Sequence, residues 1–450
     1  MRQNQSDSLG TAPIGKLLIQ QAVPASIGIL VMSLNVVVDT IFVGNWIGAI
    51  AIAAINVVLP ISFFISAIGM AVGIGGASII SRALGKNSTY RASRVLGNQI
   101  LLVLTVTLPM VMFGILMADT LIPLFGGKGA IFEFAKNYYK IVLYGVPLLA
   151  LSMVGSNVIR AEGKPAFAMM AMIIPSVLNL VLDYIFIFIF EWGMEGAAWA
   201  TVASYAGGLG YILYFFLSGK SELKLRLTYF RFHFPILKEI SALGFVTLSR
   251  QAIVSVTYLL MNNLLFQYGG ETSVAAYGII GRMLMFALFP VLGITQGFLP
   301  IAGYNYGAHQ FSRVRESINR AIFFAGILAM AIFLLIVFFS KEIVVIFTRD
   351  VEIVTIAPKY MRWVFAATPI IAIQLIGAAY FQAIGKAVPA LLLTLTRQGF
   401  FFIPLVLVLP QFFGEIGIWM AFPIADVLAT IVTGYFLNRE IKKNLIPAEQ

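Results

Sequence analysis

The 450-residue sequence contains no cysteine and only two histidines, His233 and His309. The absence of cysteine excludes disulfides, zinc–thiolate sites, iron–sulfur clusters and a cysteine nucleophile. Both histidines fall in polar stretches between apolar runs, so we expect no metal or catalytic cluster built on histidine. These absences predict a protein that is not an enzyme and that needs no cofactor.

Charge is also scarce. Only 11% of the residues are charged and 60% are hydrophobic, whereas an average soluble protein is about 25% charged. A soluble surface cannot be built from this composition, so the sequence predicts a membrane protein.

Long apolar runs recur along the whole chain. A helix that crosses the hydrocarbon core needs about 20 mostly apolar residues, and twelve such runs are present. They lie near residues 16–41, 48–80, 93–118, 133–156, 166–190, 194–218, 235–267, 272–300, 314–339, 353–380, 388–410 and 415–438. The first run contains Pro24 and lacks a small-residue cleavage site, so we expect it to remain as a helix rather than to act as a signal peptide.

Basic residues concentrate on one set of connections between these runs, which holds 20 of the 30 lysines and arginines. The set comprises Arg2, Lys16, Arg82, Lys86, Arg91, Arg94, Arg160, Lys164, Lys220, Lys224, Arg226, Arg231, Lys238, Arg313, Arg315, Arg320, Lys386, Arg439, Lys442 and Lys443. Because lysine and arginine favour the cytoplasmic side, both termini are predicted to be cytoplasmic. The net charge of +11 is then explained by the orientation of the protein in the membrane, and we expect no nucleic-acid partner.

The two halves of the sequence resemble each other at a fixed offset of 222 residues. This offset pairs Gly75 with Gly297 and Arg91 with Arg313, among other matches. Because each half has an even number of helices, both enter the membrane from the same side and are related by a two-fold axis along the membrane normal. The predicted fold is all-α, with an N-lobe at 1–218, a cytoplasmic loop at 219–234 and a C-lobe at 235–450.

Six ionisable residues lie inside the predicted membrane helices. They are Asp39, Asp183, Asp426, Arg250, Arg282 and Arg397. A charged side chain at a helix centre costs at least about 2.5–3.5 kcal/mol on insertion scales. We therefore expect these side chains to face protein or water, and to mark the functional regions.

Four oxygen-bearing residues reach a similar depth in the outer half of the first lobe. Asp39 lies toward the outer end of the first helix, Asp183 on the fifth and Thr201 on the sixth, while Asn179 shares a face with Asp183. Two carboxylates, a carboxamide oxygen and a hydroxyl form a set that binds a hard monovalent cation or holds exchangeable protons. The alternative is that Asp39 is interfacial and that Asp183 pairs with an arginine for structure.

Asp426 lies near the midplane, about eleven residues into the last helix. Two interpretations stay open: a structural ion pair with Arg397 or Arg282, or a second coupling site. Pro24 interrupts the hydrogen bonding of the first helix, which predicts a bend that can couple the protonation of Asp39 to helix shape.

Several segments resemble the multidrug and toxic compound extrusion (MATE) family. They are Asp39–Gly44 (DTIFVG), Asn179–Phe188 (NLVLDYIFIF), Gly196–Thr201 (GAAWAT), Pro300–Gly307 (PIAGYNYG), Gln382–Lys386 (QAIGK) and Gly417–Ala421 (GIWMA). The resemblance covers almost the whole chain, in order. It implies an exporter with two six-helix lobes that works by alternating access and is energised by inward H⁺ or Na⁺.

The likeness is to the DinF-like and MepA-like branch of that family. It implies that Asp39, Asn179, Asp183 and Thr201 form the cation site, with a backbone carbonyl near Ala197 as a fifth ligand and Pro24 at the bend. The same positions would hold Na⁺ if that is the coupling ion. The NorM-like branch uses acids on helices 7 and 10, and the stretches Ala252–Phe266 and Ile370–Phe381 of these helices carry none here. Asp426 lies outside the pattern.

The prediction is therefore a monomeric multidrug antiporter of the cell or inner membrane that exports amphipathic, often cationic, drug-like compounds. Its predicted partners are these small molecules and the lipid bilayer. The alternative is a flippase for a lipid-linked or amphipathic substrate in the same broader superfamily, which the three intramembrane arginines keep open.

Overall fold

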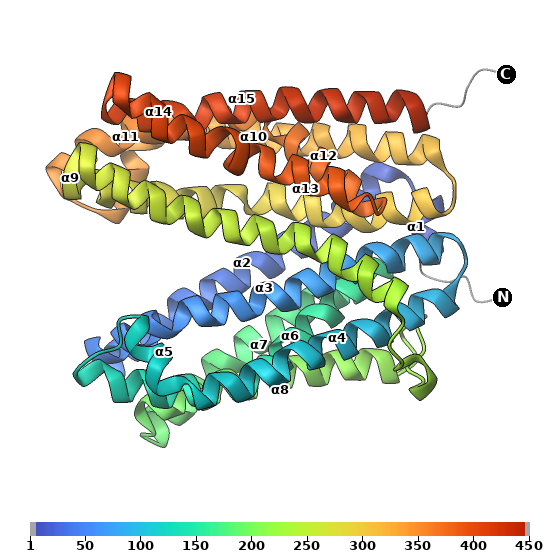
Figure 1. Ribbon diagram of the computed structural model, residues 1–450, viewed down its shortest axis with the longest axis horizontal. Helices are drawn as coiled ribbons and strands as arrows, with labels where there is room; N and C mark the ends of the chain where they lie inside the picture. Colours follow the sequence, from blue (N-terminus) through green and yellow to red (C-terminus); the bar gives the residue numbers. More distant parts are fainter. Residues whose placement is uncertain (1–5, 446–450) are drawn as a thin grey trace. The chain divides into compact units, whose positions relative to one another are not determined.

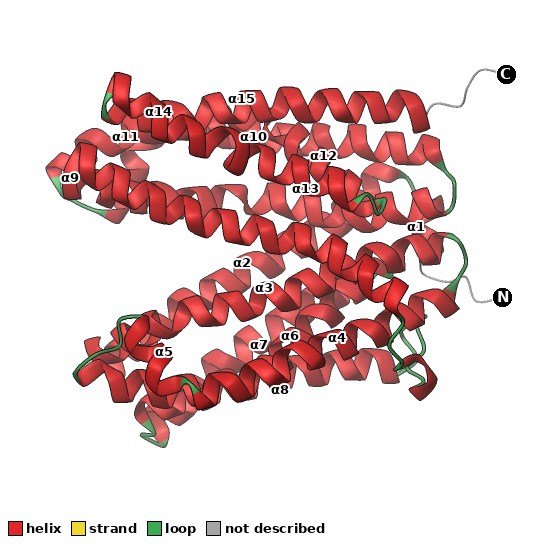
Figure 2. Cartoon of the chain, in the orientation of Figure 1, coloured by secondary structure: helices red, strands yellow, loops and turns green. Residues whose placement is uncertain are grey.

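A computed structural model describes residues 6–445 as helices joined by short loops, with no strand in that range (Figures 1 and 2). The α-helices are α1 (Asp7–Thr11), α2 (Ile14–Trp46), α3 (Ala49–Gly85), α4 (Thr89–Leu116), α5 (Ala118–Leu124), α6 (Ala130–Ala161), α7 (Pro165–Asp183), α8 (Gly193–Leu217), α9 (Phe234–Gly307), α10 (Phe311–Phe347), α11 (Val351–Phe365), α12 (Ile371–Ala383), α13 (Ala387–Leu395), α14 (Ile403–Phe413) and α15 (Glu415–Glu440). Five short 3₁₀ or π-helical segments are η1 (Tyr184–Ile189), η2 (Leu227–Tyr229), η3 (Thr368–Ile370), η4 (Thr396–Phe402) and η5 (Ile441–Leu445). The predicted all-α class is confirmed.

Eleven helices in the described range are long and apolar enough to cross a membrane, against the twelve predicted. The difference lies in α9, whose 74 residues would extend about 110 Å if straight, over three times the hydrocarbon thickness. Its backbone is not helical at Gly270, where φ is 69°, a left-handed conformation that favours glycine. The α9 segment is therefore two membrane helices joined at Gly270, and they correspond to the predicted helices at 235–267 and 272–300.

The chain forms two compact units. Unit 1 contains Met1–Leu9 and Ile27–Thr247, and unit 2 contains Gly10–Ser26 and Leu248–Gln450. The unit boundaries fall inside α2 and α9, so the first long helix of each half begins in one unit and continues in the other. These units differ from the lobes 1–218 and 235–450, which remain a prediction. Arg2, one of the basic residues that predict the orientation, lies outside the described residues.

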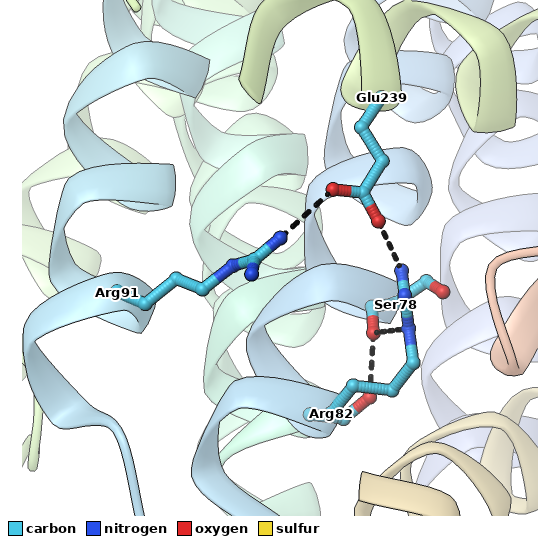
Figure 3. Close-up of polar contacts among 5 residues, drawn as sticks. Ser78, Arg82, Arg91 and Glu239 are labelled. Atoms are coloured by element: carbon cyan, nitrogen blue, oxygen red, sulfur yellow. Dashed lines mark hydrogen bonds and ion pairs between the residues drawn. The ribbon is translucent and has the colours of Figure 1, made fainter. Parts of the chain in front are cut away.

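In unit 1 the beginning of α9 packs closely against α3. A Cβ atom at Gly75 would lie 2.5 Å from the carbonyl oxygen of Ile240 and 2.9 Å from the backbone nitrogen of Gly244, so any side chain there would force the helices apart. Glu239 lies on the same stretch of α9 and accepts hydrogen bonds from two arginines (Figure 3). The distances are 2.9 Å from Arg82 and 3.2 Å from Arg91. The start of α9 is thus held to unit 1 by close packing at Gly75 and by the hydrogen bonds that Arg82 and Arg91 donate to Glu239.

Unit 2 repeats this arrangement with the beginning of α2. A Cβ atom at Gly297 would lie 2.9 Å from the backbone nitrogen of Ala22. Arg313 donates a hydrogen bond of 2.7 Å to the carbonyl oxygen of Ala12. The 222-residue offset relates Gly75 to Gly297, Ala22 to Gly244 and Arg91 to Arg313, so related residues make related contacts in the two units.

The connection between the halves is held on unit 1 by buried polar groups. Glu162, which has no exposed surface, accepts hydrogen bonds from the Ser221 hydroxyl at 2.7 Å and the Glu222 backbone at 2.8 Å. Ser93 and Asn98 accept further backbone N–H groups of the same connection, from Lys224 and His233. Burial raises the pKa of Glu162 to about 7, although the two hydrogen bonds oppose the shift.

We expect Gly75→Leu to destabilise the protein by about 1–3 kcal/mol, because the new side chain meets the backbone of α9. Gly326→Leu is the matched control, since a Cβ atom at that helical glycine meets nothing within 4 Å. Thermal unfolding of the detergent-solubilised variants measures the difference. Equal unfolding midpoints for both variants would contradict the close packing at Gly75.

A second prediction concerns pH. Folding raises the pKa of Glu162 from 4.5 to about 7, so the native state holds this proton more tightly than the unfolded chain. The resulting stabilisation is complete below about pH 4.5 and is lost as the pH rises through about 7. We expect the wild type to lose about 3 kcal/mol more than Glu162→Gln across this window. Parallel pH profiles of the two unfolding midpoints would show that this carboxyl does not titrate in the native protein.

Candidate cation-coupling site

Helices α2 and α7 run parallel and in register within unit 1. A Cβ atom at Gly28 would lie 2.8 Å from the sulfur of Met172, so the helices touch there. Seven residues further along each helix, the Asn35 side chain donates a hydrogen bond of 2.7 Å to Oδ1 of Asn179. Both contacts join residues 144 positions apart, and Asp39 and Asp183 are the next pair with this separation.

The carboxyl groups of Asp39 and Asp183 lie within hydrogen-bonding reach of each other. A carboxylate has no hydrogen to donate, so a hydrogen bond between them would require a proton on one of the two groups. Asp183 is 1% exposed, and its Oδ1 atom has no hydrogen-bond partner among the described residues. The geometry of the pair is therefore compatible with one shared proton, and Asp183 retains an acceptor oxygen without a partner among the described residues.

Thr201 and Ala197 lie nearby on α8, which packs against both α6 and α7. The Thr201 hydroxyl donates to the carbonyl oxygen of Ala197 at 3.0 Å, and it lies within hydrogen-bonding reach of the Tyr138 hydroxyl of α6. Tyr138 is buried and lies within the electrostatic reach of both carboxyls. All five predicted site residues thus belong to unit 1, although no hydrogen bond joins Asn179 or Thr201 to either carboxyl within residues 6–445.

Three further residues of this region were not predicted from the sequence. Asn35 contacts Asn179, Tyr138 contacts Thr201, and Tyr205 lies within the electrostatic reach of Asp39. The position of Asn35, four residues before Asp39, is the same as that of Asn179 before Asp183, and this repeated spacing was available from the sequence. No sequence signal distinguishes Tyr138 or Tyr205 from the other fifteen tyrosines.

The helix of Asp183 changes geometry directly after this residue. The α-helical hydrogen bonding of α7 ends at Asp183 and continues as the π-helical turn η1, where the sequence predicted an uninterrupted helix at 166–190. A π-helical turn inside an α-helix is rare and is frequent at functional positions. Pro24 lies inside the continuous helix α2, two residues before the end of its unit 2 segment at Ser26.

The intramembrane charges of unit 2 are arranged differently. Arg397 bonds both carboxylate oxygens of Asp426, with Nη2 at 3.3 Å from Oδ2 and Nε on Oδ1. Asp426 is 1% exposed, so its charge is neutralised by an ion pair inside the protein. Arg250 and Arg282 form no ion pair within the described range. The structure thus selects Arg397 over Arg282 as the partner of Asp426.

The chemistry of the unit 1 site suits only some ions. Within residues 6–445 no group of three or more histidine, cysteine, aspartate or glutamate side chains is placed to hold a metal ion. Asp39, Asp183, Asn179 and Thr201 offer oxygen atoms alone, which suit protons or a hard monovalent cation rather than a transition metal.

Comparison with known proteins identifies relatives along nearly the entire chain. A family model described as MatE matches residues 24–185 and again residues 247–408, so the two matches are separated by close to the 222-residue offset. The multidrug export protein MepA of Staphylococcus aureus strain N315 is 25% identical over 438 residues, covering 96% of this chain and 95% of the relative. The protein of the same name from Staphylococcus saprophyticus is 26% identical over 432 residues, with the same coverage.

Solved structures show the same extent of similarity. A crystal structure of MATE in the bent conformation aligns with a TM-score of 0.93 at 25% identity, covering 98% of both chains. An outward-facing multidrug resistance MATE family transporter of the MOP superfamily aligns with a TM-score of 0.90 at 26% identity, covering 97% of both chains.

Proposed function

The chain belongs to the MatE family, and from this premise we propose that it is an antiporter that exports amphipathic, often cationic organic compounds in exchange for H⁺ or Na⁺. The predicted resemblance is confirmed. The protein is a multi-pass membrane transporter of a multidrug efflux family, whose members are not enzymes.

The proximity of the carboxyl groups of Asp39 and Asp183, which lie within hydrogen-bonding reach, is the observation that carries the proposal. A buried site that holds one proton between two acids changes its charge when the proton leaves or when a cation replaces it. Ion binding biases transport only if the site has different affinities for the ion in the two conformations. Because Asp39 lies on α2, which belongs to both units, a change at this pair acts on the helix that connects them.

Alternating access is the second part of the proposal. Both α2 and α9 pass from one unit to the other, so a rearrangement of the units acts on these two helices. Pro24 removes one backbone hydrogen bond from α2 two residues before Ser26, which makes this the natural position for a bend. The proposed transporter acts as a monomer in the plasma or inner membrane.

The flippase alternative is favoured by one observation. Arg250 and Arg282 have no acidic partner in an ion pair among the described residues, in contrast to Arg397. Unpaired intramembrane arginines suit an anionic or zwitterionic headgroup better than a cationic drug.

We expect Asp39→Asn and Asp183→Asn to abolish the efflux of a fluorescent lipophilic cation driven by a proton or sodium gradient in proteoliposomes. Each substitution keeps the size of the side chain but prevents the pair from exchanging its charge. Asp119→Asn is the matched control, because this exposed acid pairs with Lys136 outside the site. Full gradient-driven flux in both site variants would refute coupling at this pair, whereas scrambling of a labelled anionic lipid without any gradient would favour the flippase.

The absence of cysteine allows single cysteines to report orientation. Thr11 and Asn444 are exposed and lie near the two termini. If both termini are cytoplasmic, the variants Thr11→Cys and Asn444→Cys should react in intact cells with a membrane-permeant maleimide and not with an impermeant one. Glu191→Cys, on a connection of the opposite set, should react with both reagents. The reverse labelling pattern would invert the proposed topology.

A further inference from the structure

The two helices that carry the carboxyl pair share a short sequence pattern. Residues 34–42 read LNVVVDTIF and residues 178–186 read LNLVLDYIF, so leucine, asparagine, valine, aspartate, isoleucine and phenylalanine recur at the same spacing. Because α2 and α7 are parallel and in register, the pattern places asparagine against asparagine and aspartate against aspartate. Asn35 is therefore the structural counterpart of Asn179, one helical turn from the carboxyl pair.

The asparagine pair has a defined direction. Asn35 donates from Nδ2 to Oδ1 of Asn179 at 2.7 Å. Nδ2 of Asn179 is then left buried without an acceptor among residues 6–445, while Oδ1 of Asp183, one turn further along α7, is buried without a donor. Asn179 is 6% exposed and Asp183 is 1% exposed, so each unpaired atom carries a desolvation cost.

This direction decides what Asn179 presents to the site. Its carboxamide oxygen, the atom that would bind a cation, already accepts the hydrogen bond from Asn35. Its NH₂ group, which bears partial positive charge, is the end of the carboxamide that Asn35 leaves unbonded. Rotation of both carboxamides by 180° would exchange the roles, so that Asn179 donates to Asn35 and its oxygen is released.

We propose that Asn35 is a positioning residue that sets the ion preference of the coupling site by fixing the carboxamide orientation of Asn179. The inference rests on the proposed antiport function and adds a determinant of ion selectivity to it. In the observed orientation the Asp39–Asp183 pair can share a proton without a further oxygen ligand. Binding of Na⁺ requires both carboxylates to be ionised and the oxygen of Asn179 to be available as a ligand, so the hydrogen bond from Asn35 opposes it.

A purely structural role for Asn35 leads to a different expectation. The contact between Gly28 and Met172 already joins the two helices two turns away. If Asn35 only added to this packing, its removal would lower stability and affect transport driven by either ion equally. The ratio of sodium-driven to proton-driven flux therefore separates positioning from packing.

The test replaces Asn35 with leucine, which has a similar size but no hydrogen-bonding group. Loss of a hydrogen bond worth about 0.5–1.5 kcal/mol frees the oxygen of Asn179, so the ratio of sodium-driven to proton-driven efflux should rise roughly twofold to twelvefold. Asn35→Gln, which keeps a carboxamide, should show a smaller rise. Asn263→Leu is the matched control, since this exposed asparagine bonds only the Leu259 carbonyl of its own helix, and its ratio should equal that of the wild type.

The possible outcomes separate the role of Asn35 from the antiport function on which it rests. An Asn35→Leu ratio equal to those of the wild type and Asn263→Leu overturns the role of Asn35, even where Asp39→Asn still abolishes flux and so supports antiport. Full flux in Asp39→Asn instead removes the proposed function itself. Where Asn35→Leu does not fold, Asn35→Ala replaces it: a raised ratio supports the role of Asn35, and an unchanged ratio overturns it.

Discussion

The cost of carboxyl groups inside a hydrocarbon layer is the constraint on which the site of this transporter depends. Asp39 and Asp183 would each be expensive alone, and they lie within hydrogen-bonding reach of each other, where one shared proton would reduce that cost. This contact exists only because α2 and α7 run parallel at a constant separation of 144 residues. A shift of either helix by one residue would turn its carboxyl away from the other, so helix register and proton binding depend on each other.

Unit 2 meets the same constraint with an ion pair. Arg397 neutralises Asp426 through two contacts. A carboxylate in a stable ion pair exchanges a proton or a cation less readily than a pair of neighbouring carboxyl groups does. Both solutions lie at π-helical segments, since η1 begins directly after Asp183 and η4 contains Arg397. The units therefore share an architecture but differ in chemistry, and the carboxyl pair makes unit 1 the better candidate for coupling.

Most of the fold follows from the sequence because the bilayer imposes length, spacing and orientation on every helix. The convergence of Asp39 and Asp183 was predictable for the same reason, since two outward-running helices place residues of equal depth side by side. The contacts of Tyr138 were not predictable, because they depend on how α6 rotates about its axis. The passage of α2 and α9 between units was missed, since apolar periodicity identifies a helix without identifying its neighbours.

The passage of α2 between the units gives the carboxyl pair a mechanical connection. Asp39 and Ser26 lie on one continuous helix, about 20 Å apart along its axis. Beyond Ser26, toward the N-terminus, the same helix is fixed within unit 2 by the glycine contact at Gly297 and by Arg313. In the proposed mechanism, a change in the charge of the pair alters the contact between α2 and α7 at one end of this helix, while the other end stays attached to unit 2. Pro24 lies inside the segment attached to unit 2, between the contact of Ala22 with Gly297 and that of Ser26 with Gly293. The turn of α2 that lacks a hydrogen bond is therefore near the edge of this attachment, where strain along the helix would be relieved.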